Sequence, residues 1–379
     1  MTALPELKFH IEEKSGMDDL HFSPAVEKGI PVYDCAALAD CLDMGDQRNA
    51  LKTELAGILL NGAGAFVLKG AYADTSAIDA ATQIFLDIIA RENEANKNRA
   101  DHFAAGGHND RIWNSLEKLC AQSPETFARY HANRWLDLAA ESWLGPAYQM
   151  TAQVNLVRPG GAAQEGHCDY HLGFMTRDQV AQYPAHIHAT SAQLTLQGAI
   201  AHCDMPVESG TTKLLPHSQK WAHNYRDFRE PNVRAFFEAN CVQLPLAKGD
   251  LLFFSPGLMH GAGENRSADI DRMANLVQIS SALGVAMETI DRTGMCKLLY
   301  PVLLAGDFSK AERDCAIANC AEGYAFPTSL DTDPPVGGLA PQTQQQLMRQ
   351  GLDEGWTAEK FNAELDARNA KRRLARAAV

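Results

Sequence analysis

The sequence has no long hydrophobic run and no paired cysteines. No apolar stretch approaches the roughly 20 residues that a membrane-spanning helix needs. The first residues, MTALPELKFHIEEKSG, lack the apolar core of a signal peptide. The 9 cysteines are scattered without a C-x-x-C pair, which argues against a disulfide framework or a zinc knuckle and indicates a reducing compartment. We therefore expect a cytoplasmic protein with no membrane partner.

Positive charge is also scarce. The chain has 34 Lys and Arg against 47 Asp and Glu, a net charge of −13, and no basic patch interleaved with aromatic residues. This balance disfavours nucleic acid as a partner. The sequence also contains no G-x-G-x-x-G, G-x-x-x-x-G-K-[ST], G-x-S-x-G or H-E-x-x-H motif. These absences exclude the usual dinucleotide-binding, nucleotide-binding, α/β-hydrolase and zincin interpretations.

What is present is an ordinary globular composition, with 46% hydrophobic and 21% charged residues. We expect one decorated domain over residues 1–379, with a mainly helical flank at 1–147 that includes an early strand. Apolar residues recur at helical spacing within 46–64 and 74–94, and AFVLKG between them is typical of a buried strand. A single further helix is predicted from the N-cap Ser123 to Gly145.

From residue 148 the chain changes to short apolar or alternating runs separated by turn residues. SAQLTLQGAIAHCD, SGTTKLLPHS, VQLPL and KGDLLFFSPG are such runs. Many short strands with Gly and Pro turns predict a mainly β fold with flanking helices, a double-stranded β-helix or jelly roll over 148–285. Residues 286–379 are interpreted as a C-terminal extension in which order weakens, with an exposed connector, FPTSLDTDPPVGGLAPQ, and a helix over about 357–376.

The segment GHCDYHLGF contains a candidate metal site. His167 and Asp169 are two residues apart, so on a strand both side chains project from the same face. His260 follows the apolar strand of KGDLLFFSPGLMH and supplies a second, distant imidazole. Two histidines and one carboxylate form the facial triad that holds Fe(II) with open coordination positions. The rival triplets, His108–Asp110 and His202–Asp204, are disfavoured because one falls in the helical region and the other leaves too few residues before His260.

The open positions suit a 2-oxo acid and O2. The far carboxylate of such a cosubstrate needs a cation, and the bidentate guanidinium of arginine suits it. Arg272 opens the predicted strand RMANLVQIS and is the favoured candidate, while Arg266 in the turn ENRS is the weaker one.

Further polar residues lie close to the triad in sequence. Gln153 and Asn155 share one face of the strand before the metal loop, where they either hydrogen-bond the cosubstrate or substrate or form a half-exposed polar face. Tyr170 and His171 either line the pocket or, in the favoured interpretation, stabilise the loop.

Taken together, the motifs resemble those of the phytanoyl-CoA dioxygenase family of Fe(II)/2-oxoglutarate oxygenases. In chain order they are HCD after NLVRPGG, then SGTTKLLPHSQKW, then KGDLLFFSPGLMHGAGENRS with an arginine beyond. The resemblance covers roughly residues 50–285. It implies that His167, Asp169 and His260 hold the metal and that Arg272 binds 2-oxoglutarate. Two departures stand out. His217 occupies the position of a glycine in the family's PGSH turn, and the spacing from His260 to Arg272 is about one residue long, which keeps Arg266 open.

The resemblance implies an Fe(II)- and 2-oxoglutarate-dependent dioxygenase that hydroxylates or otherwise oxidises a small molecule and releases succinate and CO2. The carboxylate of Asp169 favours hydroxylation or desaturation over halogenation, since halogenases of the family carry a small residue there. Two alternatives stay open: a zinc or other divalent-metal hydrolase that uses the same three ligands, and a non-catalytic jelly-roll binding protein. These motifs specify neither the substrate nor the oligomeric state.

Overall fold

The computed structural model describes residues 4–13, 20–95 and 108–372 of the chain. Within these residues an eight-stranded sheet has the order β1-β2-β3-β8-β6-β10-β5-β4, and a two-stranded sheet pairs β7 with β9. The strands are β1 (Ala25–Glu27), β2 (Ile30–Asp34), β3 (Ala65–Lys69), β4 (Asn109–Ile112), β5 (Gln149–Val157), β6 (Thr195–Ala201), β7 (Thr212–Leu214), β8 (Leu251–Phe254), β9 (His260–Ala262) and β10 (Arg272–Ser280). All neighbouring pairs are antiparallel except β2 and β3, which run parallel.

The two faces of the large sheet have different surroundings, as β10 shows. Met273, Val277 and Ile279 point into the main hydrophobic core on the helical side. The alternate residues Arg272 and Gln278 line a cavity on the other side, where the two-stranded sheet lies. This alternation is the period of two that a strand requires. It places the polar residues of β10 in a cavity between the two sheets.

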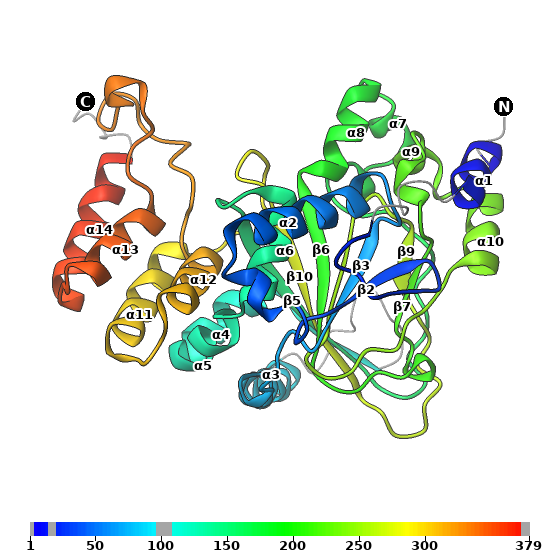
Figure 1. Cartoon of the computed structure of the whole chain (residues 1–379), viewed down its shortest axis with the longest axis horizontal. Coiled ribbons are helices and arrows are strands. Elements are labelled where there is room, and N and C mark those ends of the chain that lie inside the picture. The colour runs from blue at the N-terminus through cyan, green and yellow to red at the C-terminus, as the bar shows by residue number, and fades with distance from the viewer. Residues whose placement is uncertain (1–3, 14–19, 96–107, 373–379) are drawn as a thin grey trace.

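Helices cover the outer face of the large sheet and extend to one end of the molecule (Figure 1). The α-helices are α1 (Leu4–Glu13), α2 (Gly45–Leu60), α3 (Ser76–Ala95), α4 (Ser115–Gln122), α5 (Pro124–His131), α6 (Arg134–Leu144), α7 (Arg177–Val180), α8 (Ala185–Gln193), α9 (Asn224–Asp227), α10 (Pro231–Asn240), α11 (Arg292–Ala305), α12 (Lys310–Cys320), α13 (Gln344–Asp353) and α14 (Ala358–Arg372). Short 3-10 turns are η1 (Ala39–Leu42), η2 (His171–Phe174), η3 (Val207–Ser209), η4 (Ser218–Lys220) and η5 (Val336–Gly338).

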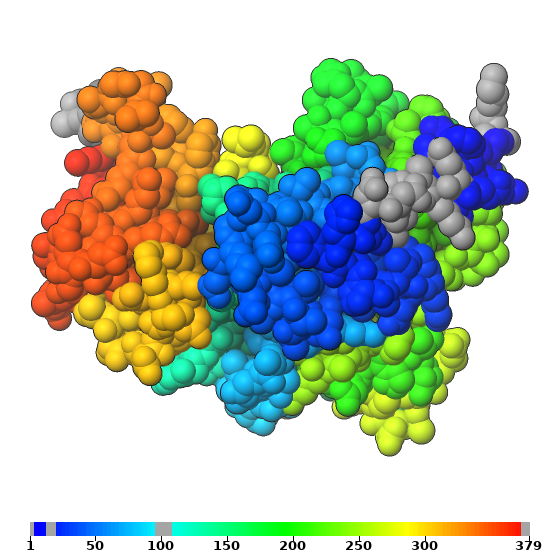
Figure 2. Space-filling view, viewed as in Figure 1, coloured from blue at the N-terminus to red at the C-terminus, as the bar shows by residue number. Residues whose placement is uncertain are grey.

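The C-terminal helices continue the main core. Helix α11 packs against α4 and α5, and α13 and α14 pack against α11 in turn. Figure 2 shows these residues, in orange and red, gathered at the end of the molecule farthest from α1. The guanidinium of Arg292 donates to the carbonyl oxygens of Met150 on β5 (2.7 Å) and Cys320 (3.1 Å). The extension is therefore tied to the large sheet by both apolar packing and hydrogen bonds.

The prediction of a mainly β protein is wrong, because helices hold more residues than strands in the described chain. Two segments account for the difference. The stretch after residue 290, where we expected order to weaken, forms four α-helices. The stretch between His167 and His260, expected to hold four strands, contains β6, β7 and β8 together with helices α7 to α10. VQLPL contributes only the isolated bridges Met205↔Leu246 and Leu214↔Val242.

Other elements follow the predictions more closely. The strand AFVLKG is β3, RMANLVQIS is β10, and the two early helices are α2 and α3. The single helix predicted from Ser123 to Gly145 is instead two, α5 and α6. The side chain of Asn133 accepts hydrogen bonds from the backbone N–H groups of Trp135 and Leu136 and so caps a new helix. Helix α14 begins at Ala358, and its predicted end at 376 lies outside the described residues.

None of the helices within residues 4–13, 20–95 and 108–372 is long and apolar enough to cross a membrane.

Candidate metal centre

His167 and His260 are brought together by backbone pairing. They face each other in an antiparallel bridge, with reciprocal N–H to carbonyl hydrogen bonds of 2.9 Å. The backbone N–H of Asp169 donates to the carbonyl of Pro256 at 2.9 Å, which fixes the carboxylate beside the two rings. His167 and Asp169 lie on no strand, contrary to expectation. The three side chains converge because the loop that carries these two residues is hydrogen-bonded to His260, at the start of β9, and to Pro256.

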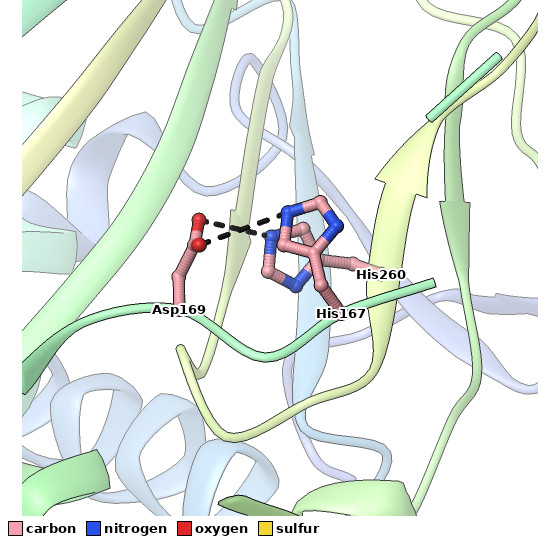
Figure 3. A group of neighbouring side chains, drawn as sticks. All are labelled: His167, Asp169 and His260. Atoms are coloured by element: carbon pink, nitrogen blue, oxygen red, sulfur yellow. Dashed lines mark hydrogen bonds and ion pairs between the residues drawn. The ribbon is translucent and has the colours of Figure 1, made fainter. Parts of the chain in front are cut away.

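The ligand atoms of the three side chains lie within 4.8 Å of one another (Figure 3). His167 Nε2 is 3.7 Å from Asp169 Oδ1, and His260 Nε2 is 3.3 Å from Asp169 Oδ2. The imidazole ring centroids are 4.5 Å apart. A divalent cation placed among the three atoms would have two nitrogen ligands and one oxygen ligand, the set expected for a non-haem iron centre.

Both imidazoles are oriented by backbone carbonyls. Nδ1 of His167 lies 2.8 Å from the carbonyl oxygen of Glu165, and Nδ1 of His260 lies 2.8 Å from that of Leu258. A carbonyl oxygen only accepts, so each Nδ1 carries the proton of this bond. Each Nε2 is thereby turned toward Asp169 as the ligand atom, the arrangement usual for metal-binding histidines.

The carboxylate of Asp169 is held in its charged form. Burial raises its pKa, but the interactions with His260 and His167 and the hydrogen bond from Gln197 outweigh burial, so the pKa lies below its usual range. Gln197 Nε2 donates to Asp169 Oδ2 at 2.7 Å. The pKa of His167 is lowered, first by burial and then by the neighbouring His260. A charged carboxylate and a neutral imidazole are the protonation states that bind a metal.

The three ligands lie on the wall of a cavity of about 1090 Å³, counted out to its open mouth. The other lining residues are Arg111, Trp113, Gln153, Asn155, Gln164, Tyr170, Phe174, Gln197, Gly198, Ala199, Met205, Thr211, Thr212, Leu246, Phe254, Gly261, Ala262, Arg272, Ala274, Leu276, Gln278 and Met287. Polar and apolar side chains share the cavity, so it suits a ligand with both kinds of surface.

The two candidate arginines lie in different surroundings. Arg272 is 6% exposed, lines the cavity and donates weakly to the carbonyl of Gly263 at 3.5 Å. No described carboxylate forms an ion pair with it. Burial lowers its pKa to about 10, so the guanidinium stays charged at neutral pH. Arg266 has a 62% exposed side chain beside Glu264 and does not line the cavity.

The polar neighbours of the triad also face the cavity. Gln153 is buried; its Oε1 accepts from Arg111 at 3.4 Å, and its Nε2 has no hydrogen-bond partner among the described residues. Asn155, two residues along β5, lines the same cavity. Tyr170 lines it too, contrary to the favoured interpretation, whereas His171 lies against Thr195, with Nε2 3.4 Å from Oγ1.

The rival triplets do not reach this site. His202 faces the helical side of the sheet, where its ring nitrogens lie 2.8 Å from Thr82 Oγ1 and 2.7 Å from Tyr130 Oη. His108–Asp110 is not in a helix as expected, because strand β4 begins at Asn109, and Asp110 forms an ion pair with Arg158 at 2.5 Å.

Strand β4 also supplies site residues that the sequence did not indicate. Arg111 and the following Trp113 line the cavity, although neither was singled out within the flank at 1–147. Gln197, which holds Asp169, was likewise missed. Its position in the alternating run of β6 was the available signal, since alternate residues share a face.

The departure at His217 has a backbone explanation. Its φ is +70°, in the left-handed region that glycine enters at the least cost. The family's glycine would suit this turn, and the structure accommodates histidine there with its backbone N–H bonded to the carbonyl of Ala63 at 2.9 Å.

Comparison with known proteins gives one family match and several similar structures. The family model for phytanoyl-CoA dioxygenase (PhyH) matches residues 60–274. A search of curated proteins finds no match. Similar solved structures include the non-heme alpha ketoglutarate dependent epimerase SnoN from nogalamycin biosynthesis, with 21% identity, 62% of this chain and 84% of that chain covered, and a TM-score of 0.41. They also include the carbocyclase SnoK from nogalamycin biosynthesis, with 19% identity, 58% and 80% covered, and a TM-score of 0.42.

The family model spans more than half of the chain and contains all three candidate ligands as well as Arg272. The chain therefore belongs to the phytanoyl-CoA dioxygenase family, whose cofactors are iron and 2-oxoglutarate.

Proposed function

We propose that the protein is an Fe(II)- and 2-oxoglutarate-dependent dioxygenase that hydroxylates a small molecule, with His167, Asp169 and His260 as iron ligands. The observation that carries the proposal is the convergence of three ligand atoms within 4.8 Å on the wall of a cavity. Family membership supports the choice of iron over zinc.

The cosubstrate is assigned to the same cavity. We infer that Arg272 binds the far carboxylate of 2-oxoglutarate, because it is a buried cation without an acidic partner among the described residues. Gln153 lines the cavity, its amide Nε2 has no hydrogen-bond partner among the described residues, and it is proposed to hydrogen-bond the cosubstrate. Arg266 is not proposed for this role, since its side chain lies on the exposed surface.

Iron, with 2-oxoglutarate and O2, supplies the oxidising power, and 2-oxoglutarate leaves as succinate and CO2. The protein's part is geometric and electrostatic. The carbonyls of Glu165 and Leu258 hold the imidazoles, and Gln197 holds the carboxylate. Because Asp169 occupies the third ligand position, hydroxylation is favoured over transfer of a halide.

The test is to purify the protein anaerobically with Fe(II), determine bound iron, and measure conversion of 2-oxoglutarate to succinate without added substrate. We expect about one iron per chain, slow succinate formation, and loss of both in His167→Ala and Asp169→Ala. Iron binding without any binding of 2-oxoglutarate would favour a metal-dependent hydrolase. Absence of metal binding would favour a binding protein and overturn the proposal.

A further inference from the structure

Tyr170 is a buried polar side chain with no use in the site described so far. It follows Asp169 directly, is 3% exposed and lines the cavity. The described residues offer its phenol oxygen no hydrogen-bond partner. That oxygen is also not among the polar atoms fully enclosed by protein, so it opens into the cavity. A buried tyrosine hydroxyl normally has a partner, which here must come from a ligand or water.

The backbone at Tyr170 is held in an unfavourable conformation. Its φ is +60° and that of His171 is +43°, both in the region that side chains other than glycine rarely enter. Such conformations persist where the surrounding structure enforces them, and they cluster at functional sites. Here the enforced backbone directs a phenol into the cavity immediately beside a proposed iron ligand.

The strand register places Tyr170 away from the proposed cosubstrate anchor. Arg272 begins β10 and pairs with Val157, whereas Thr195, which contacts His171, pairs with Ser280 at the other end of β10. The proposed carboxylate anchor and Tyr170 therefore lie toward opposite ends of the cavity. A ligand group that is hydrogen-bonded to Tyr170 therefore lies on the side of the cavity away from Arg272, which we assign to the substrate.

Apolar side chains accompany the phenol at that side. The ring of Phe174 packs edge-on against Tyr170, with centroids 5.6 Å apart, and is itself 58% exposed. Trp113 is 40% exposed, and both Trp113 and Met287 line the same cavity. Partly exposed aromatic rings beside a hydroxyl donor match a ligand with a flat apolar body that carries a polar group.

We propose that Tyr170 positions the substrate by donating a hydrogen bond from its phenol to a carbonyl or carboxylate oxygen on a small molecule with a planar apolar body. This inference rests on the proposed function, since it assumes that the cavity holds a substrate beside iron and 2-oxoglutarate. It assigns a substrate class and a positioning residue to the same site.

A matched pair of probes tests the hydrogen bond. Acetophenone carries a carbonyl oxygen, and α-methylstyrene has nearly the same shape with a CH2 group in its place. Binding of each is measured by ligand-observed NMR to the zinc-substituted protein with 2-oxoglutarate, which is diamagnetic and does not turn over. The variants are Tyr170→Phe, which removes only the hydroxyl, and Tyr183→Phe at an exposed tyrosine outside the cavity as the control.

We expect Tyr170→Phe to weaken acetophenone binding about five- to tenfold, the loss of one neutral hydrogen bond. Binding of α-methylstyrene should be unchanged, and Tyr183→Phe should bind both probes like the wild type. Equal effects on both probes, no effect on either, or no binding of either probe to the wild type would overturn the inference.

A separate measurement distinguishes this inference from the proposed function. Iron content and the affinity for 2-oxoglutarate are determined for the wild type and for Tyr170→Phe, and they should agree. If only the variant loses iron or 2-oxoglutarate, Tyr170 shapes the metal loop and does not bind substrate. If the wild type binds neither, the proposed function fails, whatever the probes show.

Discussion

Gln197 is the residue that fixes the carboxylate of the candidate metal centre, through a 2.7 Å hydrogen bond to Asp169 Oδ2. We predict that Gln197→Leu weakens iron binding about 10- to 100-fold, because partners of this kind orient metal ligands and tune their basicity. The measurement is competition with an Fe(II) chelator under anaerobic conditions. Gln278→Leu is the control, since Gln278 lines the same cavity without contacting the triad. Equal losses in both variants would contradict a specific role for Gln197.

Arg272 and Arg266 are the two candidates for the arginine that binds 2-oxoglutarate. We predict that Arg272→Gln raises the dissociation constant for 2-oxoglutarate by roughly 30- to 150-fold, the loss of a charge-assisted hydrogen bond worth about 2–3 kcal/mol. Arg266→Gln should leave it unchanged because this side chain is exposed and outside the cavity. Equilibrium titration of each variant with 2-oxoglutarate measures the two dissociation constants. The opposite pattern would assign the cosubstrate to Arg266.

Among single residues, the sequence indicates those whose side-chain chemistry is distinctive. His167, Asp169 and His260 could be selected because a spaced H-x-D pair and a distant histidine have a clear coordination meaning. Arg111 could not be selected, and Tyr170 was left between two roles, since an arginine in an edge strand or a tyrosine in a loop has many ordinary functions. Their place in the cavity depends on pairing across the sheet and on an unusual backbone conformation.

Among the elements, the break between α5 and α6 depends on one side chain. Asn133 Oδ1 accepts from the N–H groups of Trp135 and Leu136, and its Nδ2 donates to the carbonyl of Ala71. We predict that Asn133→Ala lowers the free energy of unfolding by about 1–2 kcal/mol, the usual cost of losing a helix N-cap. Urea unfolding followed by circular dichroism measures it. Asn240→Ala, at an exposed helix end, should cost less, and an equal cost would argue against the cap.

Strands β3, β5, β6, β8 and β10 of the large sheet could be predicted because their patterns are local, whereas β1, β2 and β4 were missed. RMANLVQIS alternates between the core and the cavity and forms β10 over the predicted residues. The helix break was missed because asparagine within an amphipathic stretch does not by itself show whether it caps a helix. VQLPL has the composition of a strand, but within the described chain it forms only two isolated bridges.

For the whole molecule, buried histidines couple stability to pH. Burial lowers the pKa values of His131 and His202 to about 3, below the 6.5 expected in the unfolded chain. Between these pH values the unfolded state binds more protons, so the stabilisation is complete above pH 6.5 and is lost as pH falls toward 3. Each histidine contributes a slope of up to about 1.4 kcal/mol per pH unit.

The variant His131→Phe isolates one contribution, because neither ring nitrogen of His131 has a hydrogen-bond partner in the described chain. We predict that its free energy of unfolding falls less steeply between pH 6.5 and 5 than that of the wild type. Urea unfolding at several pH values provides the comparison. Parallel curves for the two proteins would show that His131 is charged or solvated in the folded state.

The C-terminal extension is the largest feature that sequence reasoning missed. Its apolar residues, including Leu299 and Leu303 of α11, belong to the same core as Leu196 and Val277 of the sheet. The Pro- and Gly-rich connector after α12 suggested weak order for the whole stretch. A local composition signal could not show that the neighbouring segments are buried against helices more than 100 residues earlier.

The reciprocal backbone bonds between His167 and His260 have one last consequence. The two imidazoles are held facing each other by the chain itself, so folding alone assembles the coordination geometry. Removing the ion should leave the polypeptide intact, and the emptied protein should accept iron again, or a redox-inert substitute, without refolding.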